Sequence, residues 1–161
     1  MCIRDSHSGM FFLPHSKKRK IYFPEPGALY FKPSSWHNNH SFQSPISNLT
    51  ENWSQFWEEL SNQCKKNNIK LCAWMLGTHN SGIGNNYPNT SVYNAWGDPI
   101  THSLCPFNSD VVDHFVNLSR DILNLGVFDK ILIESLEYLP LRHGHHHEVI
   151  GVDFSADIDF I

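Results

Sequence analysis

Two segments of similar layout constrain the fold more than any other feature of this sequence. Each consists of an amphipathic helical pattern followed by a short apolar run, which covers residues 69–76 (IKLCAWML) in the first segment and residues 127–135 (VFDKILIES) in the second. Short apolar runs bounded by polar residues are typical of strands buried on both faces of a parallel sheet. The alternation therefore predicts consecutive parallel strands joined by right-handed crossover helices.

The two helices are predicted from apolar spacing and from the residues at their ends. Thr50 caps a first helix that begins at Glu51, and either Asn108 or Ser109 caps the second. Gly126 ends the second helix, because glycine is common just past a helix C-terminus. Apolar residues at helical spacing define the buried faces: Trp53, Phe56, Trp57, Leu60 and Cys64 in the first helix, and Val111, Val112, Phe115, Val116, Leu118, Ile122 and Leu123 in the second.

The lengths of the loops predict where a functional site lies. Long polar loops follow both predicted strands, at residues 77–106 and at the histidine-rich stretch that ends near Glu148, whereas the loops that precede the strands are short. In parallel α/β folds the loops after the carboxyl ends of the strands carry the site. Neither strand is followed by a G-x-G-x-x-G sequence, which argues against a dinucleotide-binding fold.

Glu134 is the leading candidate for catalysis. It stands at the end of the apolar run of residues 131–133, where a buried carboxylate is costly unless it is paired or opens onto a cleft. Such a group can serve as a general acid, a base or a nucleophile. Glu137, His79 and Asn80 are candidate substrate contacts beside it, and Trp96 is a candidate for stacking on a substrate ring.

Histidines are most closely spaced in the loop at residues 143–148, which reads HGHHHE. Imidazoles can bind a metal, move protons or hydrogen-bond to sugar hydroxyls. The spacing is not that of an H-E-x-x-H zinc motif. Three interpretations stay open: a structural polar loop, a substrate-binding loop, and a divalent metal site. The candidate substrate contacts in this loop are His143, His145, His146, His147 and Glu148.

Two segments resemble the glycosyl-hydrolase-like TIM-barrel proteins. These segments are residues 70–76 (KLCAWML) and residues 104–134, which begin LCP and end FDKILIE. The chain also resembles a group of bacterial proteins with an HGHHHE loop. The resemblance implies an α/β fold, a partial (β/α)8 barrel spanning residues 7–161 and corresponding roughly to the N-terminal half of the domain. A complete barrel takes about 250 residues.

The resemblance also implies roles for particular residues. Asp129 matches the aspartate that opens the family's strand, and Glu134 matches the first carboxylate at its end. Ser135 stands where a second aspartate is usual, so the second acid is left to Glu137, Glu148 or residues outside the chain. The implied activity is that of a carbohydrate-active hydrolase. A metal-dependent hydrolase that uses the histidine loop and a non-catalytic sugar-binding protein are the alternatives.

The composition of the chain argues against two classes of partner, nucleic acid and a membrane that the chain would span. The formal net charge of −4 and the single short basic run at residues 17–20 argue against binding of nucleic acid, and no apolar run approaches the roughly 20 residues of a membrane helix.

The first six residues, MCIRDS, lack the charged start and apolar core of a signal peptide and are interpreted as a sequencing artefact. The remaining cysteines, Cys64, Cys72 and Cys105, form no C-x-x-C pair and are expected to be free thiols.

Overall fold

The computed structural model describes residues 2–3, 10–12, 19–21 and 27–138. A small parallel sheet forms its centre, in the order β1-β4-β7, from β1 (Cys2–Ile3), β4 (Cys72–Leu76) and β7 (Lys130–Glu134). The register pairs Cys72 with Lys130 and Leu76 with Glu134. The parallel pairing predicted for the two apolar runs is therefore confirmed. The short strand β1 comes from the first six residues and pairs with β4 at Trp74 and Met75.

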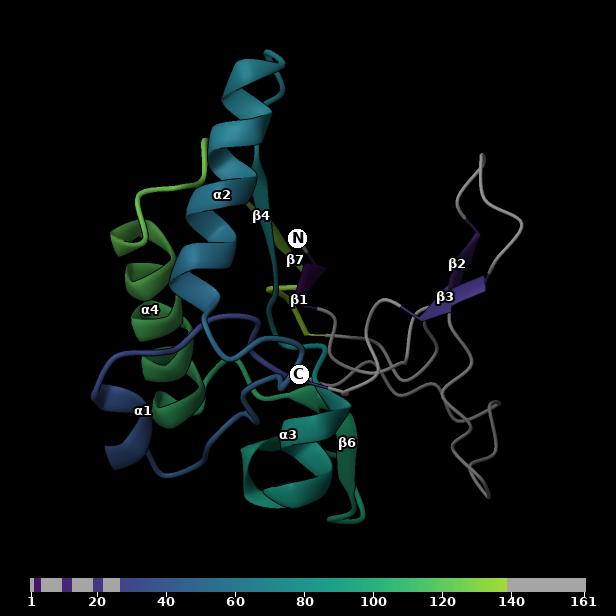
Figure 1. The fold of residues 1–161 in the computed structure, drawn as a ribbon. Coiled ribbons are helices and arrows are strands. Elements are labelled where there is room, and N and C mark those ends of the chain that lie inside the picture. Colours follow the sequence, from purple (N-terminus) through teal and green to yellow (C-terminus); the bar gives the residue numbers. More distant parts are fainter. Residues whose placement is uncertain (1, 4–9, 13–18, 22–26, 139–161) are drawn as a thin grey trace.

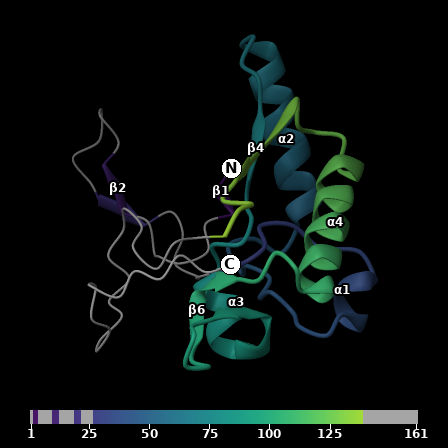
Figure 2. The same ribbon diagram turned by 180° about the vertical axis from the view of Figure 1, so that it is seen from behind.

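Two long helices lie together on one side of this sheet (Figures 1 and 2). Helix α2 (Trp53–Lys66) begins after Asn52, whose side chain accepts a hydrogen bond from the main-chain nitrogen of Gln55. Helix α4 (Ser109–Asn124) begins after Asn108, whose side chain caps it. Gly126 follows α4 with a φ of +64°, the left-handed conformation that ends many helices. The cap of α4 is one of the two residues predicted, whereas that of α2 lies two residues after Thr50.

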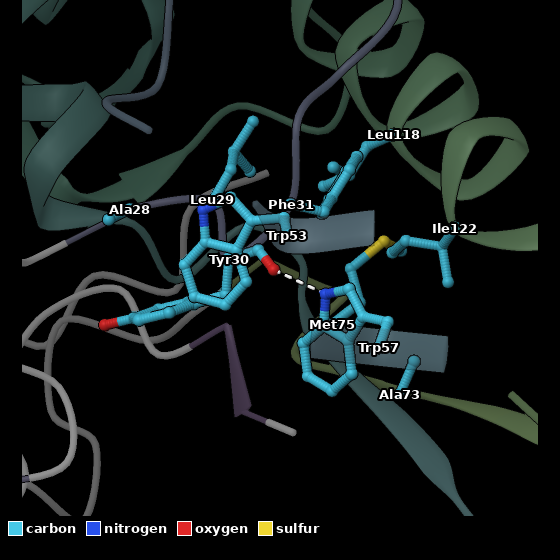
Figure 3. Close-up of a cluster of buried hydrophobic side chains, with 10 residues drawn as sticks. All are labelled: Ala28, Leu29, Tyr30, Phe31, Trp53, Trp57, Ala73, Met75, Leu118 and Ile122. Atoms are coloured by element: carbon cyan, nitrogen blue, oxygen red, sulfur yellow. Dashed lines mark hydrogen bonds between the residues drawn. The ribbon is translucent and has the colours of Figure 1, made fainter. Parts of the chain in front are cut away.

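The core fills the space between these helices and the sheet (Figure 3). Its buried side chains are Ala28, Leu29, Tyr30, Phe31, Trp53, Trp57, Ala73, Met75, Leu118 and Ile122. Trp57 is 2% exposed and donates its indole N–H to the main-chain oxygen of Tyr30 at 2.8 Å. This bond satisfies the one polar atom of a large buried side chain and holds the segment at residues 28–31 under α2.

The predicted loop at residues 77–106 contains structure of its own. It forms α3 (Ser81–Asn86), the 3-10 turn η1 (Pro88–Thr90), and an antiparallel hairpin of β5 (Ser91–Tyr93) and β6 (Pro99–Leu104). Elsewhere in the described residues, α1 (Trp36–Asn39) packs beside α4, and β2 (Met10–Phe12) pairs antiparallel with β3 (Arg19–Ile21).

The predicted partial (β/α)8 barrel is wrong. Within the described residues the parallel sheet has three strands and open edges, and the remaining strands belong to two-stranded antiparallel sheets. The helix–strand alternation correctly predicts neighbouring parallel strands, but it carries no information on whether a sheet closes. The β5–β6 hairpin occupies sequence that adds no further strand to the parallel sheet.

Burial of β7 on both faces is also wrong. Only Ile131 is partly buried in this strand, while Leu132 is 53% exposed and Ile133 is 43% exposed. The reason is its position, since β7 lies at the edge of the described sheet and β4 lies at its centre. In β4, by contrast, Ala73 and Met75 face the helices and are buried. None of the described helices has the length and apolar character needed to cross a bilayer.

Candidate functional site

Glu134 is the last residue of β7, and its side chain is exposed. Its register partner is Leu76, so the chain that leaves β4 begins beside it. The main-chain N–H of Gly77 donates to the main-chain oxygen of Glu134 at 2.7 Å. The prediction of a strand-end carboxylate is confirmed in position, but the burial expected for the apolar run before it is wrong because β7 is an edge strand.

Ser135 adopts an unusual backbone conformation directly after Glu134. Its φ is +58°, a left-handed value that is costly for residues other than glycine, asparagine and aspartate. The main-chain oxygen of Ser135 accepts hydrogen bonds from the main-chain nitrogen of Thr78 at 2.6 Å and from the Thr78 hydroxyl at 2.8 Å. Backbone strain of this kind persists where the surrounding contacts hold it, and it is enriched at functional sites.

Thr78 fastens the loops after β4 and β7 to each other. Its hydroxyl also lies 2.6 Å from the main-chain oxygen of Glu137, so its one proton is shared between the two carbonyls. The Thr78 side chain is only 2% exposed, and its main-chain oxygen accepts a bond from the nitrogen of Leu104 at 2.7 Å. The carboxyl ends of β4, β6 and β7 are therefore joined at this one residue.

Gly77 allows this close approach. A Cβ atom built on Gly77 would collide with the main-chain oxygen of Ser135 and would lie 2.8 Å from a methyl group of Leu136. Any larger residue would push apart the two loops that Thr78 joins. The absence of a side chain at residue 77 is thus part of what sets the position of the segment after Glu134.

His79 and Asn80 continue from β4 toward α3. His79 forms an isolated antiparallel bridge with Ser103, and its ring centroid lies 6.4 Å from that of His102, nearly perpendicular to it. Asn80 is 7% exposed, and its side-chain oxygen accepts from the main-chain nitrogen of Ile83 at 2.8 Å as the cap of α3. The structure thus gives Asn80 a local structural role that accounts for its polar oxygen.

The other predicted substrate contacts are placed differently. The side chain of Glu137 is exposed, three residues after Glu134. Trp96 is 69% exposed in the turn of the β5–β6 hairpin, beyond the pair Tyr93–Pro99. The contact with Thr78 is at the opposite end of β6, so the hairpin directs Trp96 away from the strand ends. His143, His145, His146, His147 and Glu148 lie outside the described residues, and their roles stay predictions.

A buried histidine cluster was missed in the sequence. His114 is 1% exposed on α4, and its ring contacts Trp36, His40, Phe42 and Phe115 at centroid distances of 5.4, 5.5, 4.9 and 5.5 Å. Burial, followed by the proximity of His40 and His37, lowers the pKa of His114 to about 3. The available signal was its position in the apolar stripe between Val111 and Leu118.

These contacts make the carboxyl end of β4 and β7 the candidate site, with the exposed carboxylate of Glu134 at its centre. Among the residues that the structure describes, no group of three histidine, cysteine, aspartate or glutamate side chains is arranged to hold a metal ion. Comparison with known proteins adds no family to this description: no family model matches the chain, and neither the curated proteins nor the solved structures include a significant match.

Proposed function

We propose that the chain is a carbohydrate-active hydrolase in which Glu134 supplies the acid or nucleophile. The observation that supports the proposal most is the setting of this carboxylate. It is exposed at the carboxyl end of a parallel strand, and it is followed at once by the left-handed Ser135. Hydrogen bonds fix the backbone of both residues. The main-chain N–H of Gly77 donates to the oxygen of Glu134, and that of Thr78 donates to the oxygen of Ser135.

Hydrolysis of a glycosidic bond requires a carboxyl group that contacts the glycosidic oxygen or the anomeric carbon. A carboxyl group on a fixed backbone can protonate the leaving oxygen when it is in its acid form, and as a carboxylate it can activate a water molecule or attack the sugar directly. Glu137 is the nearest carboxylate in sequence and is also exposed, which makes it the candidate for the second acid. Its main-chain oxygen is held by Thr78 at 2.6 Å, so the segment between the two carboxylates is anchored.

The decisive test replaces the charge without changing the shape. Glu134→Gln and the control Glu58→Gln, an exposed glutamate on α2, are compared with the unchanged chain on a panel of polysaccharides, with released reducing ends as the readout. We expect Glu134→Gln to lose roughly 10²–10⁴-fold in turnover, the usual effect of removing a general acid or base. We expect Glu58→Gln to keep full activity, and circular dichroism to show that both variants fold.

The outcomes separate hydrolysis from binding. Equal turnover in Glu134→Gln and the unchanged chain would refute the role of this carboxylate. Saturable binding of a polysaccharide without release of reducing ends would replace the hydrolase by a sugar-binding protein. Where turnover is present, nuclear magnetic resonance of the first-formed anomer distinguishes a retaining from an inverting reaction, which require carboxyl separations of about 5 Å and about 6.5–9.5 Å respectively.

A further inference from the structure

Phe107 is an aromatic side chain displayed in solvent on a fixed turn. It is 82% exposed, although burying a phenylalanine normally stabilises a fold. The turn is held on both sides, because the nitrogen of Cys105 donates to the oxygen of Thr90 at 2.8 Å and the nitrogen of Asn108 donates to the oxygen of Cys105 at 3.1 Å. Asn108 also donates its side-chain amide to the oxygen of Asn89 at 3.2 Å. Phe107 is therefore presented by a braced backbone.

Tyr138 stacks against this ring. The two ring centroids are 5.6 Å apart, with an angle of 28° between the planes, and Tyr138 is itself 40% exposed. Burial, followed by the neighbouring Cys105 thiol, raises the pKa of Tyr138. Phe107 and Tyr138 together form a two-ring platform that is exposed at the surface of the protein.

A short, anchored segment links the platform to the candidate catalytic residue. Tyr138 is four residues after Glu134, and a chain of that length spans at most about 14 Å. Thr78 holds the intervening segment at the oxygens of Ser135 and Glu137. The other ring, that of Phe107, comes from the loop after β6. The last residue of β6 is Leu104, and its main-chain nitrogen donates to the main-chain oxygen of Thr78. Both rings are thus tied to the residue that fixes the backbone beside Glu134.

We propose that Phe107 and Tyr138 form a binding platform for the pyranose ring of a carbohydrate substrate beside Glu134. This proposal rests on the proposed function, which it extends to a class of substrate. A pyranose presents a face of C–H groups and a rim of hydroxyls. The negative face of an aromatic ring attracts the C–H groups, while carboxylates accept hydrogen bonds from the hydroxyls. The exposed rings and the exposed carboxylates of Glu134 and Glu137 together meet these two requirements.

The test measures binding separately from turnover. Cellohexaose, maltohexaose, xylohexaose and chitohexaose are titrated by isothermal calorimetry into the full chain carrying Glu134→Gln, so that no hydrolysis takes place during the titration. Phe107→Ala, Tyr138→Ala, Phe107→Trp and the control Leu123→Ala are then added singly to this background. Leu123 is 68% exposed on α4 and is matched to Phe107 in exposure. Removal of exposed rings is expected to leave the fold intact, and circular dichroism checks this.

We expect at least one hexasaccharide to bind. Phe107→Ala and Tyr138→Ala should each weaken this binding at least tenfold. Phe107→Trp should retain the binding, and Leu123→Ala should leave it unchanged. Binding that both alanine variants leave unchanged would overturn the platform, even if Glu134 proved essential for turnover. Absence of binding by all four saccharides would overturn it too, as would self-association that Phe107→Ala abolishes without saccharide binding. Conversely, platform-dependent binding with normal turnover in Glu134→Gln would uphold the platform and refute the catalytic role.

Discussion

The indole N–H of Trp36 donates to a carboxylate oxygen of Asp121 at 2.7 Å, across 85 residues of sequence. The same oxygen accepts a bond from the main-chain nitrogen of Ser34 at 2.8 Å, and Asp121 is only 8% exposed. A carboxylate that is nearly buried is thus satisfied by two donors from the segment that carries α1. This arrangement makes Asp121 the main polar link between α1 and α4.

Asp121→Ala is therefore expected to destabilise the fold by roughly 2–3 kcal/mol, because hydrogen bonds to charged groups are strong and two donors would lose their partner. Asp121→Asn keeps an acceptor oxygen and is expected to cost less. Urea unfolding followed by tryptophan fluorescence provides the free energies. Asp113→Ala, at an exposed aspartate of the same helix, is the control. Equal stabilities for Asp121→Ala and Asp113→Ala would contradict the assignment.

The free energy of unfolding is expected to fall as the pH is lowered, because of His114. Burial, with His40 and His37 nearby, lowers its pKa in the folded state from 6.5 to about 3. Between these values the unfolded chain binds a proton at this residue and the folded chain does not. The contribution of neutral His114 to the free energy of unfolding is thus fully present above pH 6.5. It is lost as the pH falls toward 3, by roughly 1.4 kcal/mol per pH unit.

The measurement is urea unfolding between pH 7 and pH 5, a range that lies above the titration of ordinary carboxylates. From pH 6.5 to pH 5 the loss from His114 is expected to be roughly 2 kcal/mol. His114→Leu removes the titrating group, so its stability should depend less steeply on pH by about that amount. The comparison uses pH slopes because the substitution also changes packing. Parallel slopes for the two proteins would rule out His114 as the source.

Two glycines are expected to respond very differently to the same added methyl group. A Cβ atom on Gly84 would collide with the main-chain oxygen of Thr101 and lie 2.9 Å from the Ser91 hydroxyl, whereas a Cβ atom on Gly126 would meet nothing within 4 Å. At Gly126 only the φ of +64° opposes alanine, which costs about 1–2 kcal/mol. Gly84→Ala must also displace backbone, so we expect it to lose at least about 3 kcal/mol or fail to fold. Thermal unfolding of both variants checks the order, and similar losses would contradict it.

Local features of the sequence predicted local structure well. Two adjacent residues, Asn108 and Ser109, are predicted as possible caps of the second helix, and Asn108 is the one whose side-chain oxygen accepts from Asp110 and Val111. Gly126 was recognised because glycine tolerates a positive φ, which it has. The parallel pairing of residues 72–76 with residues 130–134 was predicted from the order of elements. Each of these predictions depends on forces that act over a few residues or between successive elements.

The predictions that failed depended on the surroundings of an element. The apolar run Ile131-Leu132-Ile133 suggested a strand covered on both faces, yet Leu132 and Ile133 are largely exposed because no described element covers this edge. The sequence also gave no reason to place Tyr138 against Phe107 or Trp36 against His114, since these contacts join segments far apart. Of the candidate site, Glu134 and the loop after β4 were predicted, whereas the aromatic pair was not.

The contact between β4 and β7 also bears on the order in which the chain folds. The N–H of Leu71 donates to a carboxylate oxygen of Asp129, a partner 58 residues further along. A loop of that length must close before any bond of this strand pair forms, and the entropy of closure is not repaid until several bonds are in place. The turns of α2 and α4 need only neighbours three or four residues away. We therefore expect the helices to begin forming before β4 and β7 pair.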